Sequence, residues 1–342
     1  MIDLFSDTRT QPSSEMRRAM AEAEVGDEQA DLDPTVTALC ERVADLLGKD
    51  KAVYLPSGTM CNEIAYRVHC RPGEEIILDR TAHGIIAEAG GPAALALAML
   101  YPLDGERGQF SPEQVQGAIR SGSRYEPRSR LISIEQTSNW GGGSVWPLEV
   151  LREIGGIAIQ NGLAMHMDGA RLMNAVVASG IEARAHAAPF NSLWLDFSKG
   201  LGAPVGAVLA GDEDFIHEAW RLKQQMGGAM RQAGIIAAGC LHALDHHIDR
   251  LVDDHANAKH LAEGLAELPG IELDPSLIET NIIFFDLSPT APDAPTLAKR
   301  LLEDGVRIGA MGERRMRAVT HLNIDKAAVE QALMVMKTAL LA

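Results

Sequence analysis

The sequence predicts an α/β protein in which a doubly wound sheet is followed by a smaller C-terminal α/β domain. Short apolar segments alternate with segments of helical spacing along much of the chain. Several apolar segments are continuous rather than alternating, as is typical of parallel strands covered by helices on both faces. At 342 residues the chain is long enough for two domains. We place them at residues 1–245 and 246–342, with the N-terminal arm in the first.

The expected elements follow from these patterns. Strands are expected at 51–55, 75–78, 98–101, 130–135, 163–167, 192–196, 206–209, 281–285, 306–309 and 317–322. Helices are expected at 13–23, 34–48, 58–69, 111–121, 147–160, 169–179, 295–304 and 326–341, with a long helical region over 212–268. The helix at 34–48 has the clearest start, because Asp33 is a favourable N-cap and Pro34 suits the first helical position.

Composition and charge exclude several classes of function. The formal net charge of −16 argues against nucleic acid or an anionic membrane as a partner, because both attract basic surfaces. We find neither a signal peptide nor an apolar stretch of membrane-spanning length. The four cysteines lack metal-binding and disulfide-framework spacing, which favours reduced thiols and a cytoplasmic location.

Asp168 and Lys199 are the most informative pair of residues. Each follows an apolar segment, in Met165-His166-Met167-Asp168 and in Asp196-Phe197-Ser198-Lys199. In an open α/β sheet, the carboxyl ends of the strands form the ligand site. A lysine there can hold pyridoxal 5′-phosphate (PLP) as a Schiff base, while a carboxylate keeps the pyridine nitrogen protonated. The pair therefore suggests a PLP enzyme.

Two glycine-rich turns are candidates for binding the cofactor phosphate. Ser57, Gly58 and Thr59 lie between a strand and a helix, where free N–H groups and hydroxyls can surround an anion. The second turn carries Arg231, which is a plausible further phosphate ligand but would equally suit an exposed helix start. The glycine-rich nucleotide loop that ends in Gly-Lys-Ser/Thr is absent, which weakens a kinase or ATPase interpretation.

The remaining candidate residues suit an amino-acid substrate. His83 follows a predicted strand, and its imidazole could stack on the cofactor ring and act as a base near neutral pH. Arg171 and Arg317 are candidates for the α-carboxylate, because a guanidinium binds a carboxylate with two parallel hydrogen bonds. The histidines around 242–260 have no recognised ligand spacing, so we expect no metal site.

Taken together, these motifs resemble the low-specificity L-threonine aldolases, a group of fold-type-I, aspartate aminotransferase-like PLP enzymes among the β-eliminating lyases. The resemblance covers nearly the whole chain. It rests on these segments in the family's order: 5–12, 25–27, 33–36, 56–59, 88–91, 168–171, 198–202, 227–232 and 319–322.

The resemblance implies a role for each candidate residue. Lys199 would form the Schiff base, Asp168 would contact the pyridine nitrogen, and His83 would stack on the ring and act as the base. The phosphate would be held by Gly58, Thr59 and Arg231, with Ser57 beside them. The substrate carboxylate would be held by Ser6, Arg171 and Arg317, and Arg171 would also contact the cofactor.

Two positions depart from the family pattern. Ala30 stands where the family usually has an active-site tyrosine, and Ser138 where it usually has a histidine that contacts the substrate hydroxyl. Both changes put a small side chain where a large ring is expected near the substrate's β-carbon. They suggest a β-substituent bulkier than the methyl group of threonine, with Ser138 still lining the substrate site.

The activity implied by the resemblance is cleavage of a β-hydroxy-α-amino acid to glycine and an aldehyde. Threonine, allo-threonine and a phenylserine-like analogue are candidate substrates, and the family implies a homodimer or homotetramer. The same fold also supports β-eliminating lyases and aminotransferases, so these stay as alternatives. A catalytically inactive binding module is a further alternative, against which the presence of both Lys199 and Asp168 argues.

Overall fold

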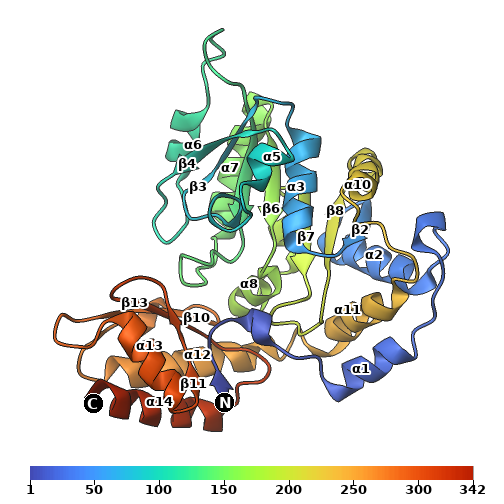
Figure 1. Ribbon diagram of the computed structural model, residues 1–342. Coiled ribbons are helices and arrows are strands. Elements are labelled where there is room, and N and C mark those ends of the chain that lie inside the picture. The colour runs from blue at the N-terminus through green and yellow to red at the C-terminus, as the bar shows by residue number, and fades with distance from the viewer. Residues whose placement is uncertain (342) are drawn as a thin grey trace.

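The computed structural model describes residues 1–341 and confirms the α/β fold class (Figure 1). The large lobe is built on a seven-stranded sheet. Its strands lie in the order β2 (Lys51–Leu55), β8 (Ala207–Gly211), β7 (Ser192–Asp196), β6 (Ala164–Asp168), β5 (Ser129–Glu135), β3 (Glu75–Asp79) and β4 (Met99–Leu103).

Helices cover both faces of this sheet, as the continuous apolar segments predict. Alternate residues of a strand point to opposite faces. Accordingly, Tyr54 of β2 belongs to one cluster of buried apolar residues, while Val53 and Leu55 belong to another. The helices of the large lobe are α1 (Ser14–Ala21), α2 (Pro34–Leu47), α3 (Gly58–His69), α4 (His83–Ile86), α5 (Gly91–Ala94), α6 (Pro112–Ala118), α7 (Leu148–Asn161), α8 (Leu172–Ser179), α9 (Ala183–Ala187), α10 (Glu213–Gln225) and α11 (Gly234–His246).

Strand β8 is the exception to the expected parallel sheet. It runs antiparallel to both of its neighbours, β7 and β2. A parallel return needs a crossover of a dozen or more residues, usually containing a helix. The segment 197–206 between β7 and β8 contains no helix, so the chain turns back beside β7. The parallel strands β5, β6 and β7 therefore all end at the edge of the sheet from which this turn, with Lys199, departs.

The smaller lobe contains a four-stranded antiparallel sheet. Its strands lie in the order β12 (Gly309–Ala310), β13 (Arg315–Val319), β10 (Ile282–Leu287) and β9 (Ile271–Glu272). It packs with α12 (Leu251–Ala266), α13 (Ala294–Glu303) and α14 (Lys326–Leu341). The region 212–268, which we expected to be one long helical region, is divided into α10, α11 and α12 by turns.

The N-terminal strand belongs to the smaller lobe. Strand β1 (Ile2–Asp3) pairs in parallel with β11 (Val306–Arg307), and Leu4 is buried in the small-lobe core. Figure 1 shows the N-terminus (blue) beside the C-terminal helices (red). The division also lies slightly later than residue 245, because Leu251 packs in the large-lobe core whereas Ala258 of the same helix packs in the other. The structure thus groups the N-terminal residues with the lobe that we placed at 246–342.

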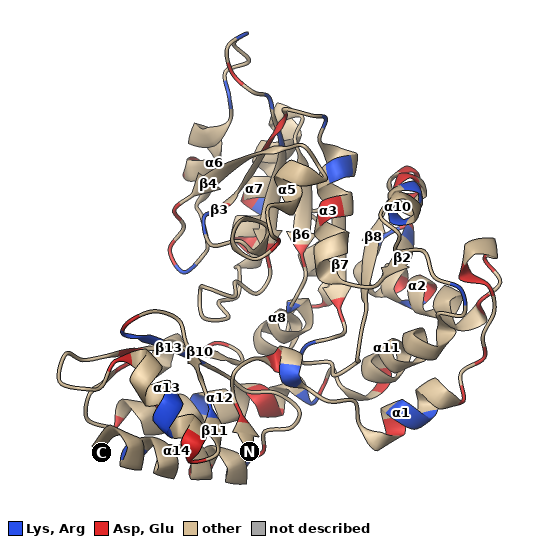
Figure 2. Ribbon diagram, viewed as in Figure 1, with Lys and Arg blue, Asp and Glu red and all other residues tan. Residues whose placement is uncertain are grey.

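Acidic and basic residues are interspersed over both lobes, and acidic residues mark the ends of the central strands β6 and β7 (Figure 2). None of the helices within residues 1–341 has the length and apolar character needed to span a membrane. Asp33 caps α2 as predicted, since its carboxylate accepts hydrogen bonds from the backbone N–H groups of Thr35 and Val36 at 3.1 and 3.0 Å.

A buried carboxylate joins the N-terminal arm to both lobes. Asp7 lies in the short 3₁₀ helix η1 (Asp7–Arg9) and is fully buried. The guanidinium of Arg171 donates two hydrogen bonds of 2.7 Å to it, and the amide of Asn281 donates a third of 3.1 Å. Burial alone would raise the pKa of Asp7, but the Arg171 guanidinium outweighs burial and holds the pKa well below its usual range. The carboxylate is therefore ionised at neutral pH.

We predict that Asp7→Asn lowers the free energy of unfolding by about 3–5 kcal/mol, because Arg171 would stay buried without its counter-charge. Denaturant unfolding at pH 7 measures this. Because the folded pKa is depressed, the contribution of Asp7 is present above about pH 4 and is lost as pH falls through the folded value. The variant should therefore lose less stability than the parent chain on acidification.

Asp104→Ala, which removes an exposed partner of Arg80, is the control and should change stability little. Equal effects of the two substitutions would contradict the prediction.

Candidate active site

Lys199 lies in the turn that follows β7, at the carboxyl edge of the large sheet. Its side chain is only 18% exposed, and its ammonium forms an ion pair with Asp196, the last residue of β7. The Nζ atom also lies 5.6 Å from the centre of the Trp194 ring. Burial alone would lower the pKa of Lys199, but Asp196 and Asp168 together raise it. The structure thus holds the amine in a confined site between carboxylates.

Asp168 ends β6, next to β7 in the same sheet. One carboxylate oxygen accepts a hydrogen bond from the side-chain amide of Asn62 at 2.9 Å, and the other accepts one from the backbone N–H of Ala170 at 3.0 Å. Within residues 1–341, no lysine or arginine forms an ion pair with this buried carboxylate. Burial raises its pKa, although His83 and Lys199 act in the opposite direction. A carboxylate with only neutral hydrogen-bond donors is well suited to a cationic ligand.

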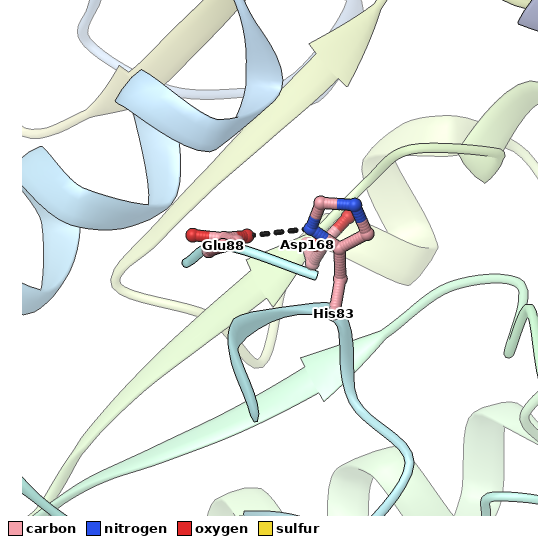
Figure 3. Close-up of side chains that lie close together, drawn as sticks. All are labelled: His83, Glu88 and Asp168. Atoms are coloured by element: carbon pink, nitrogen blue, oxygen red, sulfur yellow. Dashed lines mark hydrogen bonds and ion pairs between the residues drawn. The ribbon is translucent and has the colours of Figure 1, made fainter. Parts of the chain in front are cut away.

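His83 begins the short helix α4 and lies close to Asp168. Its Nδ1 atom is 2.7 Å from Oε1 of the buried Glu88, and ligand atoms of His83, Glu88 and Asp168 all lie within 4.8 Å of one another (Figure 3). Burial alone would lower the pKa of His83, but Glu88, Asp168 and Glu135 raise it above its usual value. Since Glu88 occupies Nδ1, the other ring nitrogen, Nε2, is the one available to a ligand.

The predicted phosphate-binding turn begins α3. Ser57 is the N-cap, and its hydroxyl accepts a hydrogen bond from the backbone N–H of Met60 at 3.2 Å. A Cβ atom on Gly58 would lie 2.1 Å from the Trp194 ring, so only glycine allows the turn to approach this side chain. The N–H groups of Gly58 and Thr59 belong to the first helical turn, where an anion is favoured. Arg231 is exposed and pairs with Asp27 at 2.9 Å, so it lies outside the buried part of the site.

The three residues predicted to hold a substrate carboxylate differ in how far their hydrogen-bonding groups are already engaged by the protein. Arg171 is engaged by Asp7, and the Ser6 hydroxyl accepts a hydrogen bond from the Thr8 hydroxyl at 2.9 Å. Arg317 donates to Asn139 Oδ1 at 3.1 Å and to a backbone carbonyl at 3.3 Å. Its Nε atom is buried and has no acceptor in the described chain. Of these three residues, Arg317 is thus the one whose guanidinium keeps an N–H donor available for a ligand.

The two departures from the family pattern lie in different environments. Ser138 is buried, and its hydroxyl accepts a hydrogen bond from the backbone N–H of Gly141 at 3.2 Å. A Cβ atom on Gly108 would lie 2.0 Å from this hydroxyl, so Ser138 packs against a neighbouring loop. Ala30 is exposed at the end of the 3₁₀ helix η2 (Glu28–Ala30). The part that either residue plays in substrate binding stays a prediction.

Sequence reasoning did not assign a role to several residues of the site. Asn62 connects Asp168 with Glu88, since its amide donates to both carboxylates, while its carbonyl oxygen accepts from the Trp194 indole at 2.7 Å. Asp196 could have been found, because it ends the predicted strand just before Lys199. Asn62 gave no such signal, because its partners lie far along the chain and only the fold brings them together.

Comparison with known proteins identifies the family. The beta-eliminating lyase family model matches residues 3–288. The chain is 39% identical to the low specificity L-threonine aldolase of Escherichia coli K12 over 95% of each chain. It is 38% identical to low-specificity L-threonine aldolase 1 of Arabidopsis thaliana, over 99% of this chain and 96% of the relative. The chain belongs to the threonine aldolases of the beta-eliminating lyase family.

Solved structures support the same fold for this threonine aldolase family member. A threonine aldolase from Leishmania major superposes with a TM-score of 0.84 at 18% identity, covering 99% of this chain and 100% of the other. A putative L-allo-threonine aldolase from Listeria monocytogenes gives a TM-score of 0.81 at 21% identity, covering 99% and 96%. A structure described as SPT with PLP gives 0.76 at 17% identity, covering 99% and 87%. At these identities the structures establish the fold alone.

The family is PLP-dependent, and the residues at this site fit that cofactor. Asp168 supplies a buried carboxylate without an ion-pair partner for a pyridinium nitrogen, and Lys199 supplies the amine at the same sheet edge. Gly58 lets the start of α3 pack directly against Trp194, and the first N–H groups of this helix are suited to a phosphate. Each group of the cofactor therefore has a side chain or N–H group of matching chemistry.

We predict that Lys199→Ala abolishes covalent attachment of PLP. Borohydride treatment of the loaded enzyme should fix a pyridoxyl group on Lys199, which peptide mapping after digestion would locate. Lys223 is the matched internal control, because it is also buried and ion-paired, in its case with Glu28. A label on Lys223, or undiminished labelling of the variant, would refute the assignment.

Proposed function

We propose that this protein cleaves a β-hydroxy-α-amino acid into glycine and an aldehyde with PLP as cofactor. The observation that carries the proposal is the convergence of Lys199, Asp168 and His83 at the carboxyl edge of one sheet. PLP, when bound, supplies an electron sink for the pair of electrons in the breaking Cα–Cβ bond. The chain's own residues would hold the reactants and move the proton.

The residues divide into cofactor and substrate roles. Lys199 would hold the cofactor covalently, Asp168 would keep its ring nitrogen protonated, and Ser57, Gly58 and Thr59 would hold its phosphate. Arg317 would bind the substrate α-carboxylate through its spare N–H group. Arg171, held by Asp7, would contribute its positive charge close by, and we retain Ser6 and Arg231 as weaker candidates for carboxylate and phosphate.

His83 is the proposed base for the β-hydroxyl group. In our proposal its Nδ1–H donates to Glu88, which leaves Nε2 to accept the hydroxyl proton. Loss of this proton lets the C–O bond become the C=O of the aldehyde as the Cα–Cβ bond breaks. Return of a proton to Cα then gives glycine. Charges from Glu88 and Asp168 would stabilise the protonated imidazole between these two events.

A bulky β-substituent is the proposed substrate preference. Phe284 of β10 pairs directly with Arg317 of β13, so their side chains share one face of the small sheet. The Trp140 ring stacks on Phe284 with 5.7 Å between the ring centres, and Asn139 beside it binds Arg317. An aromatic pair thus flanks the proposed carboxylate-binding residue. Together with the small residues Ala30 and Ser138, it supports an aryl substrate.

We also propose that the protein is a cytoplasmic homo-oligomer, a dimer or a tetramer. Leu32 and Val25 are 68% and 42% exposed, and both lie near Ala30 in the segment that precedes α2. Exposed apolar residues of this kind are covered in many subunit interfaces.

Product analysis tests the activity and the substrate preference together. We expect glycine and an aldehyde from threonine, allo-threonine and phenylserine, with the highest kcat/KM for phenylserine because its ring buries more apolar surface. Trp140→Ala should lower kcat/KM for phenylserine more than for threonine. A keto acid with ammonia would indicate elimination instead, and a clear preference for threonine would contradict the proposed aryl site.

Removal of the Arg317 guanidinium tests the carboxylate site. A hydrogen-bonded charge contributes about 1.5–3 kcal/mol, so Arg317→Gln should lower kcat/KM about 10- to 100-fold. Most of the change should appear in KM, because the α-carboxylate is bound before and during the reaction. Arg80→Gln is the control, since Arg80 is an exposed arginine of the large lobe that pairs with the exposed Asp104. Equal losses in both variants would contradict a specific role for Arg317.

A further inference from the structure

Glu63 is a buried carboxyl group that the proposed mechanism does not use. It lies on α3 directly after Asn62 and is 1% exposed. Within the described chain, no N–H or O–H group donates to either of its oxygens, and no lysine, arginine or histidine forms an ion pair with it. An ionised carboxylate in such a place would carry the full cost of desolvation. The carboxyl group must therefore be neutral or share a proton.

The neighbour that can accept this proton is Glu88. Oε1 of Glu88 accepts from the Asn62 amide at 2.7 Å and lies 2.7 Å from His83 Nδ1. Oε2 of Glu88 is buried and, among residues 1–341, receives no hydrogen bond. The charge of Glu88 acts on Glu63, and neither Glu63 oxygen nor Glu88 Oε2 has a hydrogen-bond partner in the described chain. Gly91, three residues after Glu88, leaves the space for the Glu63 carboxyl group, because a Cβ atom there would lie 2.1 Å from Glu63 Oε1.

We propose that Glu63 is protonated in the working enzyme and donates its proton to Glu88 Oε2, which makes Glu63 a positioning residue for His83. Two adjacent buried carboxyl groups cannot both ionise, so one proton must remain between them. The hydrogen-bond partners of the two carboxyl groups determine which of them holds the proton. Glu88 receives the Asn62 amide and faces the imidazole, whereas Glu63 has no donor of its own. Burial and the Glu88 charge accordingly raise the pKa of Glu63 to about 9.

The shared proton has a consequence for the proposed base. With Glu63 as its donor, Glu88 remains an anion and accepts the proton of His83 Nδ1. The imidazole then presents an unprotonated Nε2 to the substrate and gains stabilisation when Nε2 takes up a proton. Without that donor, Oε2 of Glu88 would be buried and unsatisfied, and the anion would be disfavoured. Glu63 would thus act on His83 through Glu88.

Other titratable groups face this network and must be held constant in a test. Glu135 on β5 and Asp168 on β6 both act on His83, and burial raises the pKa of Glu135 to about 7. From α3, Cys61 and Tyr66 face Glu88. Lys199 and Arg171 act on Asp168 and Glu135 respectively. These groups remain in place when only residue 63 is changed, so differences between variants at this position report on Glu63.

Two substitutions separate a proton donor from a mere space-filling residue. Glu63→Gln keeps the shape and an N–H donor for Glu88, whereas Glu63→Leu removes the donor. The inference rests on His83 being the base, so the first readout is the pH profile of kcat/KM of the holoenzyme. Glu63→Gln should match the parent chain within about twofold and leave the acidic limb in place. Glu63→Leu should lose about tenfold and move that limb to lower pH, because a destabilised Glu88 anion supports protonated His83 less.

A second readout is independent of activity. Infrared spectra of the holoenzyme at pH 7 should contain the carbonyl band of a protonated carboxylic acid, which subtraction of the Glu63→Gln spectrum would resolve. Glu75→Gln is the control and should remove no such band, because Glu75 is equally buried but is ion-paired with Arg120 at 2.8 Å. Circular dichroism and PLP content would establish that each variant folds.

The outcomes are distinguishable. If the acid band is found but no amino acid is cleaved, the proton assignment stands and the proposed function fails. Absence of the band would overturn the proposal. An acidic limb that shifts equally in Glu63→Gln and Glu63→Leu would also overturn it, because equal shifts would mean that Glu63 is ionised in the parent chain. A Glu63→Leu variant with the pH profile of the parent chain would also overturn it.

Discussion

The Asp7–Arg171 ion pair is the interaction on which the arrangement of the site depends. It connects an arm from the N-terminus, the turn after β6 that also carries Asp168, and, through Asn281, the start of β10 in the smaller lobe. Because both charges are buried, neither can be satisfied by water if the partner moves away. The pair therefore fixes the small lobe, with Arg317, relative to the carboxyl edge of the large sheet.

The same rule of paired buried charges organises the rest of the site. Lys199 faces Asp196, His83 faces Glu88, and Asp168 keeps only neutral donors. The atoms that lack a partner are correspondingly informative. In our proposals the Nε atom of Arg317 would serve an anionic substrate group, whereas the unpartnered oxygens of Glu63 and Glu88 would share a proton that belongs to the protein. An unpartnered N–H donor thus suggests a binding site for an anion, whereas unpartnered carboxylate oxygens suggest a bound proton.

Much of the fold could be predicted from the sequence, because short apolar segments and capped helices are local patterns. Lys199 and Asp168 could be placed at a common edge because parallel strands end together. The engagement of Arg171 could not be foreseen, since its partner Asp7 is remote in the chain and only tertiary structure joins them. The reversed direction of β8 was missed because a short connection was treated as one more parallel crossover. Glu63 was overlooked because a charged residue in a helix is ordinarily solvent-exposed.

The pairing of β1 with β11 has a consequence for the order in which the protein can be assembled. Strand β1 must wait for its partner β11, which is synthesised after all seven strands of the large sheet. Contacts between such remote segments form slowly because a long loop must be closed. The arm that carries Asp7 would accordingly dock after the large sheet has formed, and the buried charge of Arg171 would remain without its partner until β11 has been synthesised. Pairing of Arg171 at the carboxyl edge of the large sheet would thus depend on a strand of the smaller lobe.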